Sequence, residues 1–174
     1  MELQEAISLI QTDKLIQDTQ TIWADLGCGS GLFTRALSGL LFTGSTIYAV
    51  DKNISSFQKS SFPNPVIVKT IESDFVKEDL NLQNLDGILM ANALHFIRNK
   101  KSFIEKMIPY FRNAPIFLMV DYDTDLPNPW VPYPLSFGTL KKLFTELGFS
   151  VVKKINEKKS LYHSGKIYSV FITR

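Results

Sequence analysis

The chain has 174 residues, about the length of one domain, and this excludes two full-sized domains. Hydrophobic residues make up 45% and charged residues 21% of the chain, so the sequence can close one sizeable core and global disorder is excluded. Nineteen basic and 17 acidic residues leave a formal net charge of +2, which gives no strong attraction to nucleic acid or to an anionic membrane.

The single cysteine and the N-terminal residues bear on where the protein is found. Cys28 has no second cysteine to pair with, and the first residues show no signal-peptide pattern. No apolar run approaches the roughly 18 residues that cross a bilayer. We therefore expect a cytoplasmic protein that does not span a membrane.

Helical and strand patterns alternate along the chain. Apolar residues three and four apart predict a helix near the N-terminus, in a segment 1–20 that either covers a sheet or forms a lid over a cleft. In chain order, helices are expected over 2–16, 32–41, 54–60, 100–111 and 137–147, the last capped by Ser136 and ended by Gly148. Strands are expected over 21–24, 46–50, 66–71, 86–91, 116–120, 149–155 and 166–173, the last two as a hairpin.

This alternation predicts the fold class. Apolar strands that lack a polar alternate face indicate a mostly parallel sheet covered on both sides. We predict an α/β fold, a three-layer α/β/α sandwich with a mostly parallel seven-stranded sheet and an antiparallel strand at the C-terminal hairpin, in one domain over 1–174. Ligands of such sheets bind beyond the carboxyl ends of the strands.

A proline-rich segment follows the fifth strand. Four of the eight prolines lie within 122–134, which predicts a rigid loop. Trp130 and Tyr133 in this loop either form an aromatic wall for a flat or cationic substrate or pack beneath the loop as core. We expect 122–134 to be the substrate loop.

A glycine-rich loop, DLGCGSG at residues 25–31, joins the first strand to the next helix. Its glycines allow a sharp turn and a close approach of the backbone to a ligand. A dinucleotide fingerprint would need glycine at the position of Leu32, and a phosphate-binding P-loop would need a Gly-Lys-Ser/Thr sequence that this loop lacks. Both phosphate-binding interpretations are therefore weakened.

The motif DLGCGSG, followed 20 residues after Gly31 by Asp51, resembles the S-adenosylmethionine-dependent methyltransferases with a Rossmann-like fold. The later segments IYAVDKN, VIVKTIESDF and DGILMANALHFI resemble the cofactor-binding segments of that family in order and spacing, and LKKLFTELGFSVV resembles its last helix and sixth strand. The resemblance covers most of the chain. It implies a methyltransferase whose cofactor is S-adenosyl-L-methionine.

The resemblance assigns roles to three acids. Asp51 would bind both ribose hydroxyls, Asp74 would lie near the adenine amino group, and Asp25 would lie near the methionine portion. The simpler alternatives are a solvated turn acid for Asp51, a neighbouring acid in place of Asp74, and an acceptor of turn amides for Asp25. The expected cofactor-binding residues are Asp25, Gly27, Cys28, Gly29, Gly31, Asp51, Lys52, Ser73, Asp74, Phe75, Ala91 and Asn92, with no metal site.

Three further expectations concern individual residues of that set. Phe75 is expected to pack against the adenine ring. The resemblance also implies that the backbone at Ala91 and Asn92 faces the aminocarboxylate end of the cofactor. Cys28 is expected to fill space in the loop rather than act as a nucleophile, because no positioned base accompanies it.

Methyl transfer from a sulfonium is an in-line displacement with a neutral leaving group, so alignment matters more than acid assistance. A base is needed only where the acceptor must lose a proton. Candidates are His95 after the fourth strand, and Asp121 and Tyr122 after the fifth. His95 has the alternative of a packed or exposed side chain that supports the cleft wall, and His163 is expected to be solvated.

The acceptor is expected to be a small molecule, bound by a monomer or a homodimer. Basic residues within 98–101 and 153–159 leave an RNA or protein acceptor open, although lysines at such positions usually face water. A cofactor-binding partner subunit without catalysis is another alternative. A nicotinamide-dependent oxidoreductase would share the strand, the glycine loop and the acid, but not the last fingerprint glycine.

Overall fold

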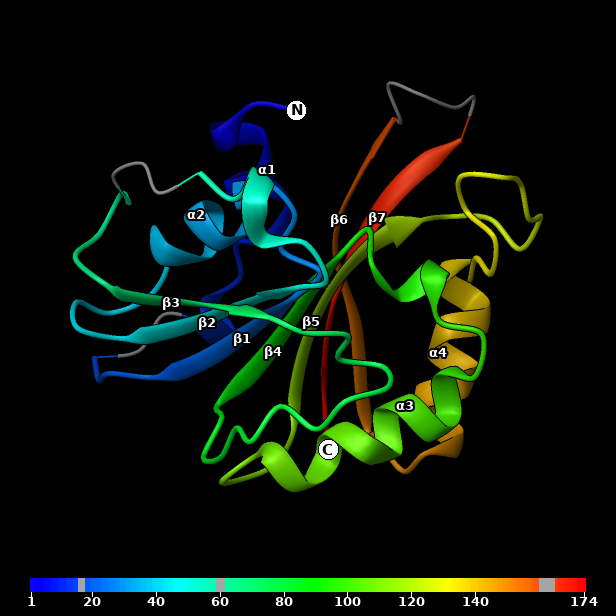
Figure 1. The fold of residues 1–174 in the computed structure, drawn as a ribbon. Helices are drawn as coiled ribbons and strands as arrows, with labels where there is room; N and C mark the ends of the chain where they lie inside the picture. The colour runs from blue at the N-terminus through cyan, green and yellow to red at the C-terminus, as the bar shows by residue number, and fades with distance from the viewer. Residues whose placement is uncertain (16–17, 59–61, 160–164) are drawn as a thin grey trace.

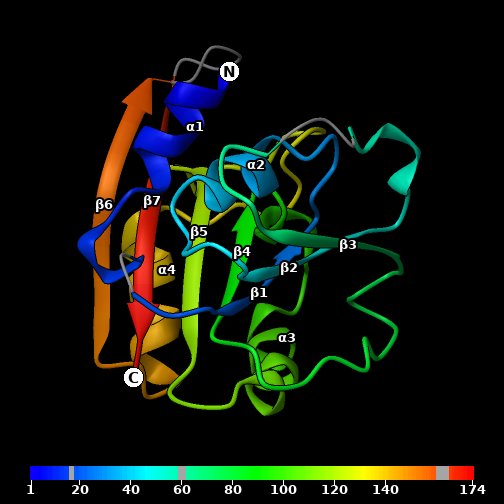
Figure 2. The same ribbon diagram turned by 90° about the vertical axis from the view of Figure 1, so that its left-hand side faces the viewer.

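The computed structural model describes residues 1–15, 18–58, 62–159 and 165–174. Its sheet has seven strands in the order β3-β2-β1-β4-β5-β7-β6. Strands β1 to β5 run parallel, and β7 lies antiparallel between β5 and β6 (Figure 2). The strands are β1 Ile22–Leu26, β2 Thr46–Asp51, β3 Ile67–Glu72, β4 Gly87–Ala91, β5 Ile116–Tyr122, β6 Val151–Lys159 and β7 Lys166–Thr173.

Helices pack on both faces of this sheet. Figure 1 shows α1 and α2 on one face and α3 and α4 on the other. The helices are α1 Leu3–Ile10, α2 Leu32–Ser38, α3 Lys100–Met107 and α4 Phe137–Glu146. Two buried apolar clusters fill the layers, one around Phe117 and Phe144 beneath α4, the other around Leu37 and Leu118 beneath α2. The predicted three-layer α/β/α sandwich with an antiparallel strand in the C-terminal hairpin is confirmed.

The first helix lies against the sheet. α1 buries Ala6, Leu9 and Ile10 and packs on α2 and on the β5–β7 part of the sheet. The helix ends at Ile10, earlier than predicted, and a 3₁₀ turn follows at Asp13–Leu15, while residues 16–17 lie outside the described residues. A lid role for segment 1–20 stays a prediction.

Two predicted helices are shorter than the sequence pattern indicates. The one expected over 54–60 is a single 3₁₀ turn at Ile54–Ser56, because Phe57 is already extended, and residues 59–61 lie outside the described residues. The one expected over 100–111 is α3 followed by a 3₁₀ turn at Ile108–Tyr110, where Pro109 has no amide to continue the α-helical bonds. None of the helices in the described ranges has the length and apolar content that a membrane crossing needs.

The sheet is not covered evenly. Strand β3 forms one edge, and its residues are exposed or half-buried, with Ile67 53% exposed. Within the described residues, no α-helix lies between β2 and β3 to cover this edge. The sheet is covered on both sides as predicted, but the cover is incomplete at β3, because the described part of the helix predicted over 54–60 is a single 3₁₀ turn.

Candidate functional site

A cavity of about 450 Å³ opens at the carboxyl ends of the central strands. It lies beyond β1, β2 and β4, where ligands of parallel sheets bind. Five of its lining residues belong to the predicted cofactor set and four do not. The lining residues are Gly27, Asp51, Lys52, Phe75, Val76, Asn92, Ala93, Phe96 and Ile97.

The glycine loop forms one wall of this cavity, and all three of its glycines have a positive φ. Gly27 has a φ of +82°, and a Cβ there would lie 2.7 Å from the Cβ of Ala93. Gly29 has a φ of +50°, and a Cβ there would have no neighbour within 4 Å. Gly27 thus lets two protein segments touch, whereas Gly29 leaves open space that a ligand can occupy.

Asp51 holds the glycine loop and also faces the cavity. Its Oδ2 accepts a hydrogen bond from the Gly29 amide at 2.8 Å, and its Oδ1 accepts one from the Asn53 amide at 3.2 Å. The carboxylate is only part-buried, so each oxygen can accept a further hydrogen bond from a ligand hydroxyl. This geometry suits the predicted ribose contact.

Asp25 is fully buried inside β1, one residue before the strand ends, rather than after it. Its Oδ2 accepts a hydrogen bond from the Thr34 hydroxyl at 2.6 Å. Its Oδ1 has no hydrogen-bond partner among the described residues. Burial raises the pKa of Asp25 to about 7, and the charge of Asp51 acts in the same direction while the Thr34 bond opposes it.

The end of β4 presents a second unpaired oxygen. Asn92 adopts a left-handed conformation with φ of +53°, and its backbone amide donates to the Val120 carbonyl at 2.8 Å. Its side-chain Oδ1 is buried and lacks a hydrogen-bond partner among the described residues, yet the residue lines the cavity. A buried oxygen without a partner is costly, so this atom is a natural acceptor for a bound ligand. Ala91, also predicted, is buried at the strand end without lining the cavity.

The acid expected at the adenine is paired with a lysine that lines the cavity. Asp74 forms an ion pair with Lys52 at 3.1 Å, and its Oδ1 accepts from the amide of Val76 at 3.2 Å. Burial alone would raise the pKa of Asp74, but the bond and charge of Lys52, together with the turn amides, hold it below its usual value. Lys52 lines the cavity and Asp74 does not, so the geometry places the lysine at the rim.

The remaining predicted cofactor residues lie behind the cavity wall. Ser73 donates through its hydroxyl to Glu78 at 2.7 Å. A Cβ at Gly31 would lie 2.7 Å from the Phe57 ring. Cys28 is buried, and burial raises the pKa of its thiol well above the usual range, so the thiol is protonated and acts as the expected filler.

The three candidate catalytic residues meet beside this cavity. His95 Nδ1 lies 2.6 Å from Asp121 Oδ1, and both side chains are buried. The ring centroid of His95 lies 5.7 Å from that of Tyr122 and 4.3 Å from that of Phe96, which lines the cavity. Asp121 and Tyr122 lie within β5 rather than after it. The burial of His95 and Asp121 suits support of the cleft wall, and a catalytic role stays a prediction.

The substrate loop 122–134 encloses a second cavity. This cavity measures about 340 Å³ and is lined by Tyr122, Asp123, Thr124, Leu126, Pro127, Asn128, Val131, Gly165 and Lys166. At the loop tip, Asn128 Oδ1 accepts from the amides of Trp130 and Val131 at 2.9 and 3.0 Å, which fixes a tight turn. Trp130 is 76% exposed on this turn, so it does not pack beneath the loop as core.

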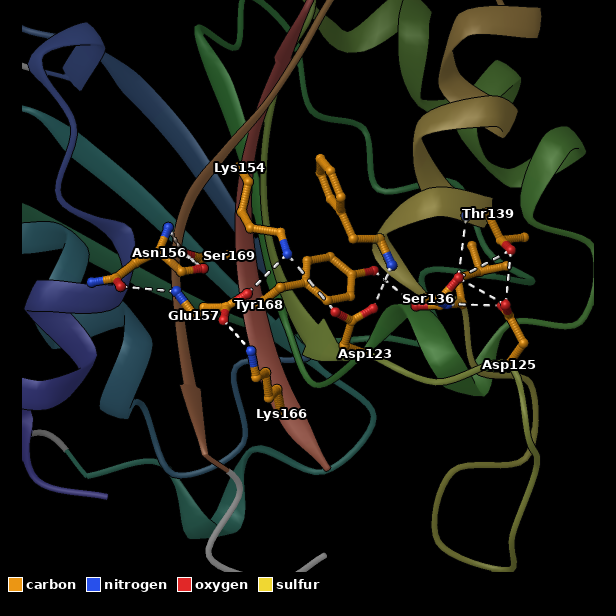
Figure 3. A network of polar contacts seen from close by, with 12 residues as sticks. Asp123, Asp125, Ser136, Thr139, Lys154, Asn156, Glu157, Lys166, Tyr168 and Ser169 are labelled. Atoms are coloured by element: carbon orange, nitrogen blue, oxygen red, sulfur yellow. Dashed lines mark hydrogen bonds and ion pairs between the residues drawn. The ribbon is translucent and has the colours of Figure 1, made fainter. Parts of the chain in front are cut away.

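A polar network ties the start of the substrate loop to α4 and to β6 (Figure 3). Asp125 accepts from the amide and the hydroxyl of Ser136, the N-cap of α4, at 2.8 and 2.7 Å. Asp123 accepts from the Phe137 amide at 2.8 Å and lies 3.8 Å from Lys154 of β6. The loop is therefore tied to α4 and to the C-terminal hairpin. His163, expected to be solvated, lies outside the described residues.

The cavity of about 450 Å³ is called the cofactor cavity below, after its predicted ligand. Sequence reasoning missed four of its lining residues. Val76, Ala93, Phe96 and Ile97 line it from the segments that follow β3 and β4. The signal that would have found the last three was already present, since ANALHFI continues directly from the end of β4 into the cleft. Phe96 is 60% exposed despite its apolar neighbours, which is unusual for a packed aromatic.

Comparison with known proteins agrees with this geometry. A family model described as "Methyltransferase domain" matches residues 24–112, from β1 through the 3₁₀ turn after α3. The cofactor cavity lies wholly within that stretch. None of the curated proteins compared with the chain matches it.

Several solved structures share the fold. A SAM-dependent methyltransferase from Aquifex aeolicus is 15% identical with a TM-score of 0.65, covering 99% of this chain and 98% of that one. The plantazolicin methyltransferase BpumL in complex with SAH is 14% identical with a TM-score of 0.66, covering 99% and 83%. A DhpI-SAM-HEP complex is 18% identical with a TM-score of 0.69, covering 96% and 84%. At these identities the likeness concerns the fold.

Proposed function

The chain belongs to the methyltransferase domain family, and we propose that it transfers a methyl group from S-adenosylmethionine to a small-molecule acceptor. The observation that carries the proposal is the Asp51 carboxylate, which holds the Gly29 amide and faces the cavity at the strand ends. Carboxylates at this place can accept two hydroxyl groups of a ribose in charge-assisted bonds.

The residues around the cavity fit S-adenosylmethionine along its length. Asp51 takes the ribose, Phe75 and Val76 supply apolar surface for the adenine, and the space at Gly29 lets the backbone approach. The unpaired buried oxygen of Asn92, which lines the cavity, is an acceptor without a donor, as a cationic amino acid portion would need. When bound, the cofactor supplies an electrophilic methyl group on a sulfonium.

The acceptor site is assigned to the substrate loop. The cavity beneath it starts at Tyr122 at the end of β5, the strand beside β4. The His95 ring lies between the two cavities, since it contacts Phe96 of one and Tyr122 of the other. A volume of about 340 Å³ suits a small molecule. The protein's task is alignment and exclusion of water, because the leaving group is neutral.

Calorimetric titration with S-adenosylmethionine and S-adenosylhomocysteine tests the cofactor assignment. Asp51→Asn keeps an oxygen for the Gly29 amide but removes the charge, so affinity should fall by about 10- to 100-fold. Asp79→Asn, a change at an exposed acid away from the cavity lining, is the matched control and should bind as the wild type does. Absence of binding by the wild type, or an unchanged affinity in Asp51→Asn, overturns the proposal.

Transfer of tritium from methyl-labelled cofactor into cell extract tests the acceptor class. Label in the small-molecule fraction supports the proposal. Label in RNA or protein would mean that the acceptor is RNA or protein rather than a small molecule. Cofactor binding with no transfer into any fraction favours the alternative of a partner subunit. Displacement of the cofactor by a nicotinamide dinucleotide favours the oxidoreductase.

A further inference from the structure

Lys100 is a lysine buried between two functional segments. It begins α3, and the whole residue is only 8% exposed. Its Nζ donates to the Ile97 carbonyl at 2.8 Å and to the Tyr133 carbonyl at 2.6 Å. Ile97 lines the cofactor cavity, and Tyr133 belongs to the substrate loop. One ammonium group thus joins the two.

A second set of contacts runs beside this bridge. The Tyr133 amide donates to the His95 carbonyl at 3.0 Å, and the Lys100 Nζ lies 5.8 Å from the centre of the Tyr133 ring. Residues 95–97 and Tyr133 are therefore tied by three backbone carbonyls, one backbone amide and one ammonium. A second buried charge, Asp121, joins the start of the loop to the same segment, since it accepts from the amides of Tyr122 at 2.8 Å and of His95 at 3.2 Å.

Burial of this ammonium is costly, which indicates that its bonds matter. Removing a lysine charge from water is unfavourable unless hydrogen bonds compensate. Burial lowers the pKa of Lys100, and the charge of Asp121 opposes that shift. The start of a helix does not need a buried lysine, because Asn99 already caps α3 through the Ser102 amide. The hydrogen bonds to the Ile97 and Tyr133 carbonyls therefore account for the buried position of this side chain.

We propose that Lys100 is a positioning residue that locks the substrate loop to the wall of the cofactor cavity, so that cofactor binding orders the loop. The proposal rests on the proposed function for the identity of the cofactor. The other end of the loop is fixed by Asp123 and Asp125 to α4, independently of the cavity. Lys100 is the connection at the end nearer the cofactor, and the loop tip with Trp130 lies between the two anchors.

Tryptophan fluorescence reports on this lock directly. The chain has two tryptophans, of which Trp23 is buried and Trp130 is 76% exposed. Quenching by acrylamide therefore reports mainly on Trp130, and a Trp130→Phe variant gives the Trp23 background. Calorimetry with S-adenosylhomocysteine measures cofactor binding separately. Lys101→Met, at the exposed neighbouring residue, is the matched control for Lys100→Met.

In the wild type and in Lys101→Met, saturating S-adenosylhomocysteine should lower the Trp130 quenching constant by about twofold. In Lys100→Met, S-adenosylhomocysteine should bind with an affinity within about threefold of the wild type but leave Trp130 quenching unchanged. Lys100→Arg, which keeps donors for both carbonyls, should restore part of the response. A full quenching response in Lys100→Met overturns the proposal, since a merely structural lysine would leave the coupling intact.

The ligand-free protein separates this inference from the proposed function. Without any ligand, Lys100→Met should show stronger Trp130 quenching than the wild type, because the loop has lost one anchor. If the wild type fails to bind S-adenosylhomocysteine but this difference is present, the cofactor assignment fails and the lock stands. If the ligand-free difference is absent, the lock fails. Should Lys100→Met not fold, Lys100→Gln, which keeps one amide donor group, is measured in the same way.

Discussion

The imidazole Nδ1 of His95 lies 2.6 Å from Oδ1 of Asp121, with both side chains buried at the ends of neighbouring parallel strands. Asp121 also accepts hydrogen bonds from the backbone amides of His95 at 3.2 Å and of Tyr122 at 2.8 Å. Its carboxylate therefore holds the segment after β4 against β5. This segment lines the cofactor cavity through Phe96 and Ile97 and contacts Tyr122, which lines the cavity of the substrate loop, through the His95 ring.

Asp121→Asn should destabilise the protein markedly. Oδ1 accepts from the Tyr122 amide and Oδ2 from the His95 amide, so the NH₂ group of asparagine would face a backbone N–H at either position. We expect the free energy of unfolding to fall by about 2–4 kcal/mol, measured by urea denaturation. Asp86→Asn removes a part-buried surface pair with Arg112 and should cost less. Equal losses in the two variants would contradict a special role for the buried pair.

The pH dependence of turnover distinguishes catalysis from support by His95. If His95 takes a proton from the acceptor, kcat of the wild type falls as the pH is lowered, because protonated imidazole is no base. His95→Gln should then lose this acidic limb and at least about 10² in kcat, with cofactor affinity unchanged. If His95 only supports the wall, His95→Gln lowers stability and has the same dependence of kcat on pH as the wild type. The profile is measured with the acceptor identified by tritium transfer.

Alanine substitutions at three glycines with positive φ distinguish the cost of backbone strain from the loss of space for a ligand. Alanine at Gly27, Gly29 or Gly148 carries the same kind of strain, about 1–2 kcal/mol. Gly148 ends α4 away from the cavities, and a Cβ there meets nothing within 4 Å. Gly148→Ala should therefore lose stability but keep its affinity for S-adenosylhomocysteine.

Gly29→Ala should lose about as much stability as Gly148→Ala and, in addition, at least about tenfold in affinity, because its Cβ enters space that the cofactor needs. Gly27→Ala should lose more stability than either, because its Cβ collides with Ala93 at 2.7 Å. Thermal unfolding and calorimetry give both quantities. Normal cofactor affinity in Gly29→Ala would show that the space beside Gly29 stays empty.

The succession of strands along the chain and the glycine loop were predictable from the sequence, because both depend on local patterns. Gly27 and Gly29 need positive φ wherever the strand turns sharply into a helix, and Asp51 ends a strand that pairs with β1. β7 was predicted over its full length, since it alternates little and is buried along almost all of its residues. Such features require no knowledge of distant parts of the chain.

The contacts that define the site were not predictable in this way. The bond between Lys100 and Tyr133 joins residues 33 apart, and the pair of His95 and Asp121 joins residues 26 apart. The sequence pattern marked Lys100 only as part of a basic run, which favours a solvated side chain. Its burial follows from the packing of the substrate loop on α3, which no local period records.

Asp25 should make the stability of the protein depend on pH in a defined direction. Its pKa is raised to about 7 in the folded protein by burial, against a usual value of 3.8. Between these values the folded state holds a proton that the unfolded state has released. The stabilisation is therefore complete below the usual value and is lost as the pH rises through about 7. The loss proceeds at up to about 1.4 kcal/mol per pH unit.

Asp25→Asn isolates this contribution, because the amide does not titrate and still offers an oxygen to the Thr34 hydroxyl. Urea denaturation at pH 5, 6, 7 and 8 should show the wild type losing stability relative to Asp25→Asn as the pH rises. Asp79→Asn, at an exposed acid, should follow the wild type at every pH. A constant difference between wild type and Asp25→Asn across this range would mean that Asp25 is ionised throughout.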